Sequence, residues 1–301
     1  MVLGIGDFTK NRSGCDDPMR IRAGFEISYF TFGETPMTLL LSVHPSRNAD
    51  LLTPDQLTTT PKVSASRHLD GFGNRVSRLT APAGPFTLAS SFIIADSGLP
   101  EPQDRTARQH PVGELPEETL PFLLGSRYCE TDRMGDLAWS LFGQTELGWP
   151  RLQAILDYVH DRISFDYDQA RPTRTAFEAN QERVGVCRDY AHLAITLCRC
   201  MNIPARYCTG YLGDIGVPPM DAPMDFSAWF EAYLGGRWHA VDARHNIPRI
   251  GRIVMARGRD ATDVAISTAF GVAQLTGFKV VTEEVRQDGR AARPEDYLAA
   301  E

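Results

Sequence analysis

Apolar and polar residues alternate in the first third of the chain, and this alternation predicts β-strands. Phe25, Ile27, Tyr29 and Thr31 occupy every second position of one run. Further runs of strand length, separated by Gly, Pro, Asn and Asp, follow at residues 37–43, 75–79 and 86–94. This spacing is typical of a β-sandwich. We therefore predict a β-rich domain over residues 21–105, after a polar, Gly-containing N-terminus at residues 1–20 that we expect to be flexible.

The pattern changes to helical spacing in the second part of the chain. Residues 99–120 contain four prolines and many charges, which predicts a linker. Beyond it, apolar residues recur at steps of three and four, and this periodicity predicts helices. The three clearest cases are residues 132–142, 150–163 and 187–201. We assign residues 106–301 to a second domain, an α+β core with a C-terminal extension.

A β-hairpin is predicted near the end of this core. The runs 226–234 and 237–241 are rich in aromatic and β-branched residues and flank Gly235-Gly236. A Gly-Gly pair between two strand patterns favours a tight two-residue turn. In that register, residues whose numbers sum to 471 face each other.

Composition and charge exclude several classes of protein. Hydrophobic residues make up 43% of the 301 residues and charged residues 23%, which is ordinary for a globular protein. The net charge of -7 argues against general nucleic-acid binding. The apolar runs are too short to span a membrane, and the N-terminus has no signal-peptide core. We therefore predict a cytoplasmic protein that binds neither nucleic acid nor membrane.

The six cysteines predict thiols rather than a metal site. They lie at positions 15, 129, 187, 198, 200 and 208, and no pair has the two-residue spacing of a zinc knuckle. We expect them to be reduced, and we expect neither a metal nor a cofactor.

Cys187 is the candidate nucleophile among these cysteines. It follows Gly185, which allows a sharp turn, and it begins the helical pattern of residues 187–201. The free N–H groups and the dipole at a helix start favour a thiolate. A buried structural thiol is the commoner case, so this position alone leaves both interpretations open.

Several motifs together resemble the transglutaminase-like family, a papain-like group of cysteine enzymes. The matching stretches are Gly185-Val-Cys187-Arg-Asp-Tyr-Ala191, Asn202-Ile-Pro-Ala-Arg206, Gly210-Tyr211, Ala228-Trp229-Phe-Glu231 and Trp238 to Asp242. The segment Asp70-Gly-Phe-Gly-Asn74 resembles the N-terminal domain of bacterial members. The resemblance implies an α+β fold: an N-terminal β-sandwich followed by a papain-like, transglutaminase-like core.

The same resemblance implies a catalytic set with one member missing. Cys187 matches the nucleophile and Asp242 matches the acid. The general base is a histidine immediately before the Ala-Trp pair, and here that position is Ser227. Serine is too short and too weakly basic to replace an imidazole. The expected site is therefore incomplete at its base.

Three other histidines are possible substitutes, and strand and helix geometry distinguishes them. His239 faces Ala232 in the hairpin register, which places it on the opposite face from Asp242. His245 has the same unfavourable parity unless the strand ends before it, and His192 lies about 140° around the helix from Cys187. Only a one-residue bulge would bring His239 to the correct face, so His239 stays an outside candidate for the base.

Two functions follow from this pattern. In the first, the chain is an enzyme that acts on amide or peptide bonds of a protein or peptide through a Cys187 thioester, by hydrolysis or acyl transfer. In the second, it is a catalytically impaired homologue that serves as a binding module. Whether the chain is active without a histidine at position 227 separates the two.

Overall fold

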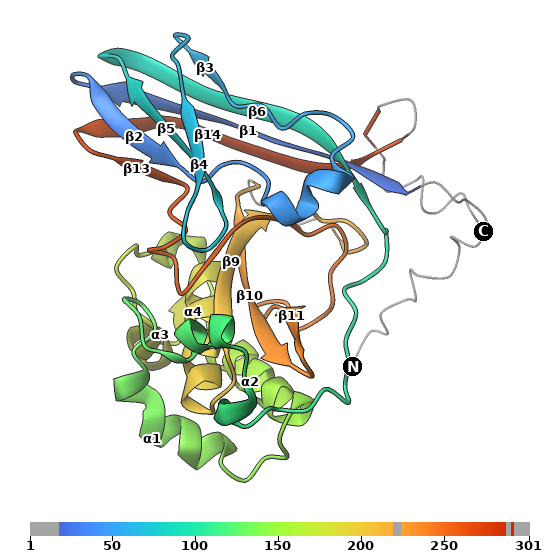
Figure 1. Ribbon diagram of the computed structural model, residues 1–301. Helices are drawn as coiled ribbons and strands as arrows, with labels where there is room; N and C mark the ends of the chain where they lie inside the picture. The colour runs from blue at the N-terminus through green and yellow to red at the C-terminus, as the bar shows by residue number, and fades with distance from the viewer. Residues whose placement is uncertain (1–17, 219–223, 287–289, 292–301) are drawn as a thin grey trace.

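The computed structural model describes residues 18–218, 224–286 and 290–291. It is an α+β protein in which a β-sandwich lies above a body of helices and a further four-stranded sheet (Figure 1). Residues 1–17, most of the segment expected to be flexible, lie outside this range, whereas Met19 and Arg20 already belong to the first strand. Among the helices that the model describes, none combines the length and the apolar character needed to cross a bilayer.

The sandwich consists of two antiparallel sheets of four strands each. The first has the order β14 (Ala273–Val285), β1 (Met19–Thr31), β6 (Gly84–Asp96), β3 (Thr58–Thr60). The second has the order β13 (Ser267–Ala269), β2 (Thr35–Leu39), β5 (Arg75–Ala81), β4 (Ser66–Leu69). Alternate side chains of both sheets, among them Ile27, Met37 and Leu88, are fully buried in a shared core. The alternating pattern of the sequence thus marks the inner faces of the sandwich.

Both ends of the chain contribute strands to this sandwich. β14 pairs with β1 along nearly its whole length, and β13 pairs with β2. The domain predicted over residues 106–301 therefore includes two strands that complete the N-terminal sheets. Hydrophobic patterning shows that a strand forms but not which sheet it joins, so the sequence placed these residues in an extension of the core.

The core body packs helices against a sheet of order β11 (Arg237–Val241), β10 (Ser227–Leu234), β9 (Ala205–Tyr211), β12 (Ile253–Gly258). The helices are α1 (Thr131–Phe142), α2 (Trp149–Arg162), α3 (Ala176–Glu182) and α4 (Cys187–Cys200). Helix α4 is central, because it contacts the other three helices and strands β9 and β10. The short elements are β7 (Ser164–Phe165), β8 (Val184–Gly185), η1 (Pro45–Asp50), η2 (Val112–Glu114), η3 (Glu117–Leu123) and η4 (Tyr167–Gln169).

The β10–β11 hairpin has the register that the sequence predicts. Ala232 pairs with His239 and Phe230 pairs with Val241. The two glycines of the turn have φ values of 59° and 82°. Such angles are strained for residues with a Cβ atom, which is why this turn uses Gly235 and Gly236.

The stretch 99–120 is more than a connection. Ala107 and Thr119 are buried, and the carbonyl of Ala107 accepts a hydrogen bond from the first residue of α2. Glu101 forms an ion pair of 2.5 Å with Arg252. Proline and charge correctly indicated an irregular backbone here, but they did not reveal that it packs against the core.

Candidate active site

The start of helix α4 places Cys187 at a fixed position. The preceding residue, Val186, is extended, and its N–H donates to a carboxylate oxygen of Asp189 at 2.9 Å. The same oxygen accepts from Arg174 at 3.1 Å, so the charge of this helix cap is compensated. A Cβ atom on Gly185 would lie 2.7 Å from the Asp189 side chain. Glycine at position 185 thus allows the cap that holds Cys187 in the first turn.

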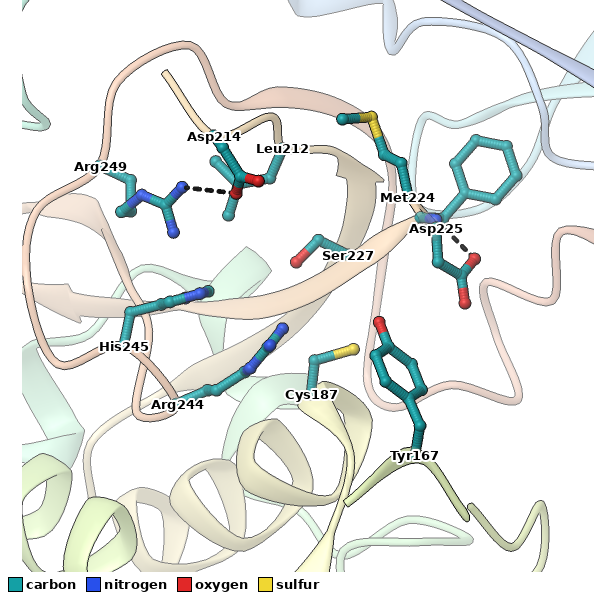
Figure 2. Close-up of a pocket in the computed structure, with 11 residues that line it drawn as sticks. Tyr167, Cys187, Leu212, Asp214, Met224, Asp225, Ser227, Arg244, His245 and Arg249 are labelled. Carbon is teal, nitrogen blue, oxygen red and sulfur yellow. Dashed lines mark hydrogen bonds and ion pairs between the residues drawn. The ribbon is translucent and has the colours of Figure 1, made fainter. Parts of the chain in front are cut away.

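Cys187 opens into a pocket between the start of α4, strand β10 and the loops after β9 and β11 (Figure 2). The side chains of Ser227, Arg244 and His245 project toward the same space (Figure 2). The lining residues are Tyr167, Cys187, Leu212, Asp214, Met224, Asp225, Phe226, Ser227, Arg244, His245 and Arg249. The pocket therefore combines a thiol with an imidazole, two carboxylates and two guanidinium groups.

The thiol of Cys187 is neutral at pH 7 despite its position at a helix start. Burial raises its pKa to about 11, and this effect outweighs a backbone hydrogen bond from Ala228 and the positive charge of Arg244, which both lower it. The sequence predicted the opposite direction, because a helix start stabilises an anion. Removal of the sulfur from water is the larger effect here.

Asp242 is buried beside the pocket and is held as a carboxylate. One of its oxygens, Oδ2, accepts from Nδ1 of His245 at 2.8 Å and from Arg252 at 3.2 Å. Burial alone would raise the pKa of Asp242, but the His245 hydrogen bond and the Arg252 charge together hold it well below its usual range. Arg252 is paired in turn with Glu101. Asp242 is thus an anion that can orient and stabilise a charged imidazole.

A tight turn brings His245 back to Asp242. Strand β11 ends at Val241, and the Asp242 carbonyl accepts from the N–H of Asn246 at 2.9 Å. The second carboxylate oxygen of Asp242 accepts from the N–H of Arg244 at 2.9 Å, which makes an Asx-type turn. Asn246 closes the turn with a φ of 51°. Asp242 therefore stabilises the turn in which its hydrogen-bond partner His245 lies.

The structure brings Cys187, Asp242 and Ser227 together but not His239. Ser227 is buried in β10 and its hydroxyl points into the pocket (Figure 2). His239 lies on the helix-facing side of β11, where its Nε2 is 3.1 Å from the carbonyl of Leu234 and its ring packs 5.3 Å from that of Trp149. The pairing of β10 with β11 runs without a shift, so the bulge that would turn His239 toward the pocket does not occur.

Comparison with known proteins identifies the family. A model described as "Transglutaminase-like superfamily" matches residues 141–243. The crystal structure of a protein from Cytophaga hutchinsonii, described as a candidate cysteine protease, shares 31% identity and superposes with a TM-score of 0.79. The alignment covers 92% of this chain and 94% of that one. The chain belongs to the transglutaminase-like superfamily. An uncharacterised Mycobacterium leprae protein, ML0607, is 25% identical over 259 residues, which are 77% of this chain and 85% of the relative.

The superfamily match ends two residues before His245. It includes Cys187, Ser227 and Asp242, but it does not reach the imidazole that pairs with Asp242. The sequence does contain an indication of this residue's position. Residues 242–246 begin with Asp and end with Asn, a composition typical of an Asx turn. The alternation of side chains along a strand therefore does not apply to His245.

Proposed function

We propose that this member of the transglutaminase-like superfamily acts on amide or peptide bonds through a thioester at Cys187. The observation that carries the proposal is the shared pocket, which is lined both by a thiol at a helix start and by an imidazole held by a buried carboxylate. Membership of the superfamily supports it. We expect the substrate to be a protein or peptide and the location to be the cytoplasm.

The chemistry would proceed in two stages. The Cys187 sulfur loses its proton to a base and attacks the carbonyl carbon, and the oxygen takes the electron pair. The backbone N–H of Cys187 lies in the first turn of α4, where it has no acceptor within the helix, and it would donate to this oxyanion. Collapse of the intermediate breaks the carbon–nitrogen bond and releases an amine. Water or a second amine then attacks the thioester, so that the outcome is hydrolysis or transfer.

A second function is favoured by two specific observations. Burial raises the pKa of the Cys187 thiol to about 11, and Ser227 occupies the position of the superfamily's base. Both features are what a binding module that has lost catalysis would show. In that case Cys187 would react with strong electrophiles but would not turn over.

An activated ester tests the proposal without knowledge of the substrate. With p-nitrophenyl acetate we expect a burst of nitrophenolate, an acetyl group on the peptide that contains Cys187, and slower release of acetate. Cys187→Ala should abolish all three. A mixture of peptides with a biotin-labelled primary amine then separates the outcomes, because hydrolysis creates new carboxyl termini and transfer creates biotin-labelled amides. Stoichiometric labelling without release would contradict the enzyme and support the binding module.

A further inference from the structure

The pocket places an imidazole where the position of the superfamily's base does not provide one. Ser227 offers a hydroxyl, which cannot accept a proton at neutral pH. His245 lines the same pocket from the loop after β11 (Figure 2). Its side chain is 18% exposed, whereas that of Asp242 behind it is 3% exposed. The imidazole thus lies between a buried anion and the pocket that holds Cys187.

The hydrogen bond to Asp242 fixes the tautomer of His245. An ionised carboxylate only accepts, so Nδ1 carries the proton of the 2.8 Å bond. The lone pair of the neutral ring is then on Nε2, the nitrogen opposite the carboxylate. Four hydrogen bonds to Asp242, from His245 Nδ1, Arg252 and two backbone N–H groups, hold this anion in place. The ring is therefore oriented as a proton acceptor.

We propose that His245 is the general base of this chain and performs the role that the superfamily assigns to position 227. The proposal rests on the function proposed above and adds the catalytic residue that the superfamily pattern leaves unassigned. The base has moved from strand β10 to the turn after β11, while the acid and the nucleophile keep their positions. Contacts between a base and its nucleophile are often long in a free enzyme and shorten when substrate binds.

His245 can accept and return every proton that the two stages transfer. Nε2 of His245 takes the proton of the Cys187 thiol as the sulfur–carbon bond forms. The imidazolium, stabilised by Asp242, gives that proton to the leaving nitrogen as the carbon–nitrogen bond breaks. In the second stage Nε2 takes a proton from water or from the incoming amine, and it returns it to the sulfur as the thioester is cleaved. Apart from the amide substrate, the reaction consumes only water or the second amine.

The surroundings of the thiol make such a base necessary. Burial raises the pKa of Cys187 to about 11, so the thiol keeps its proton at pH 7 and needs a base to become a nucleophile. Arg244, which extends from the same turn and stacks 3.6 Å from the ring of Phe165, adds a positive charge near the sulfur. The charge of Arg244 stabilises a thiolate, but its guanidinium group cannot accept a proton. The imidazole of His245, from the same turn, can accept one.

The rate of Cys187 alkylation at neutral pH tests the proposal directly. Iodoacetamide labelling is followed on the Cys187 peptide in wild type, His245→Asn, and His245→Asn with Ser227→His. Asparagine keeps a donor for Asp242 near the place of Nδ1 but has no Nε2, so the turn is preserved. His68→Asn, the same change at an exposed histidine of β4, is the matched control. Thermal unfolding shows that each variant is folded.

We expect Cys187 to be labelled more slowly in His245→Asn than in wild type, because the variant has no Nε2 to take the thiol proton. Turnover of p-nitrophenyl acetate should fall by about 10²–10⁴-fold in His245→Asn, stay unchanged in His68→Asn, and recover in part when Ser227→His restores an imidazole at the other position. Turnover and labelling in His245→Asn at the wild-type rates would overturn the proposal and leave the function standing. A labelling rate that depends on His245, in a wild type that shows no turnover, would support the role of His245 as base and overturn the proposed function.

Discussion

Two histidines lie three residues on either side of Asp242, and their surroundings are opposite. His239 lies in strand β11, where its side chain is buried against Trp149 and bonded to the backbone of Leu234. His245 lies in a turn, and its ring joins Asp242 to the pocket of Cys187. Equal distance along the chain thus gives one structural imidazole and one at the candidate active site.

Backbone geometry explains the difference between these two residues. In a strand, side chains alternate between faces, so a residue three positions from Asp242 points away from it. In the turn after Val241, the backbone reverses, and a residue three positions on returns to the same carboxylate. The end of β11 at Val241 therefore decides which histidine lines the pocket of Cys187.

Loss of the charge on Asp242 is expected to affect both activity and stability strongly. Asp242→Asn removes the anion that orients His245 and compensates Arg252, so we expect acylation of Cys187 to fall by about 10²-fold or more. The broken buried pair should also lower the free energy of unfolding by about 3 kcal/mol. Urea denaturation and the nitrophenolate burst measure the two effects. Unchanged acylation would show that the pairing with Asp242 is irrelevant to catalysis.

The same variant has a defined pH dependence. The pKa of Asp242 is lower in the folded than in the unfolded chain, so its ionised form stabilises the protein above the unfolded value near 4. This stabilisation is lost as the pH falls through the folded value. Asp242→Asn should therefore be least stable relative to wild type at neutral pH, and the gap should narrow in acid.

A smaller effect is expected at Asn246, which closes the turn. Its φ of 51° costs most side chains about 1 kcal/mol, and its amide donates to Asp157 at 2.8 Å. Asn246→Ala should lower stability by about 1–2 kcal/mol and slow acylation several-fold, because the turn no longer holds His245 as firmly. Asn246→Gly is the matched control, since glycine accepts this φ while losing the same amide. Equal acylation rates in the Ala and Gly variants would show that the conformation of this turn does not affect the function of His245.

Much of the fold was predictable from the sequence, because periodicity reports local structure. The hairpin register, the helix at Cys187 and the α+β class follow from runs of apolar residues and from Gly235-Gly236. The pairing of β14 with β1 and of β13 with β2 was not predictable, because it joins residues that are more than 200 positions apart in the chain.

The sequence predicted the candidate nucleophile and the candidate acid of the site but not the imidazole beside them. Cys187 and Asp242 lie in motifs, whereas His245 depends on where β11 ends and on the turn that Asp242 forms. The pKa of Cys187 was predicted in the wrong direction for a similar reason. The helix start is visible in the sequence, but the atoms that bury the sulfur come from several distant segments.

One measurement tests the central claim most directly: the rate of Cys187 acetylation by p-nitrophenyl acetate at pH 7 in His245→Asn and in His239→Asn. The substitution is the same and the two positions are equally far from Asp242 along the chain. We predict a loss of at least about 10²-fold for His245→Asn and a rate within about threefold of wild type for folded His239→Asn. Equal rates in the two variants, or a larger loss in His239→Asn, would contradict the assignment of the base to His245.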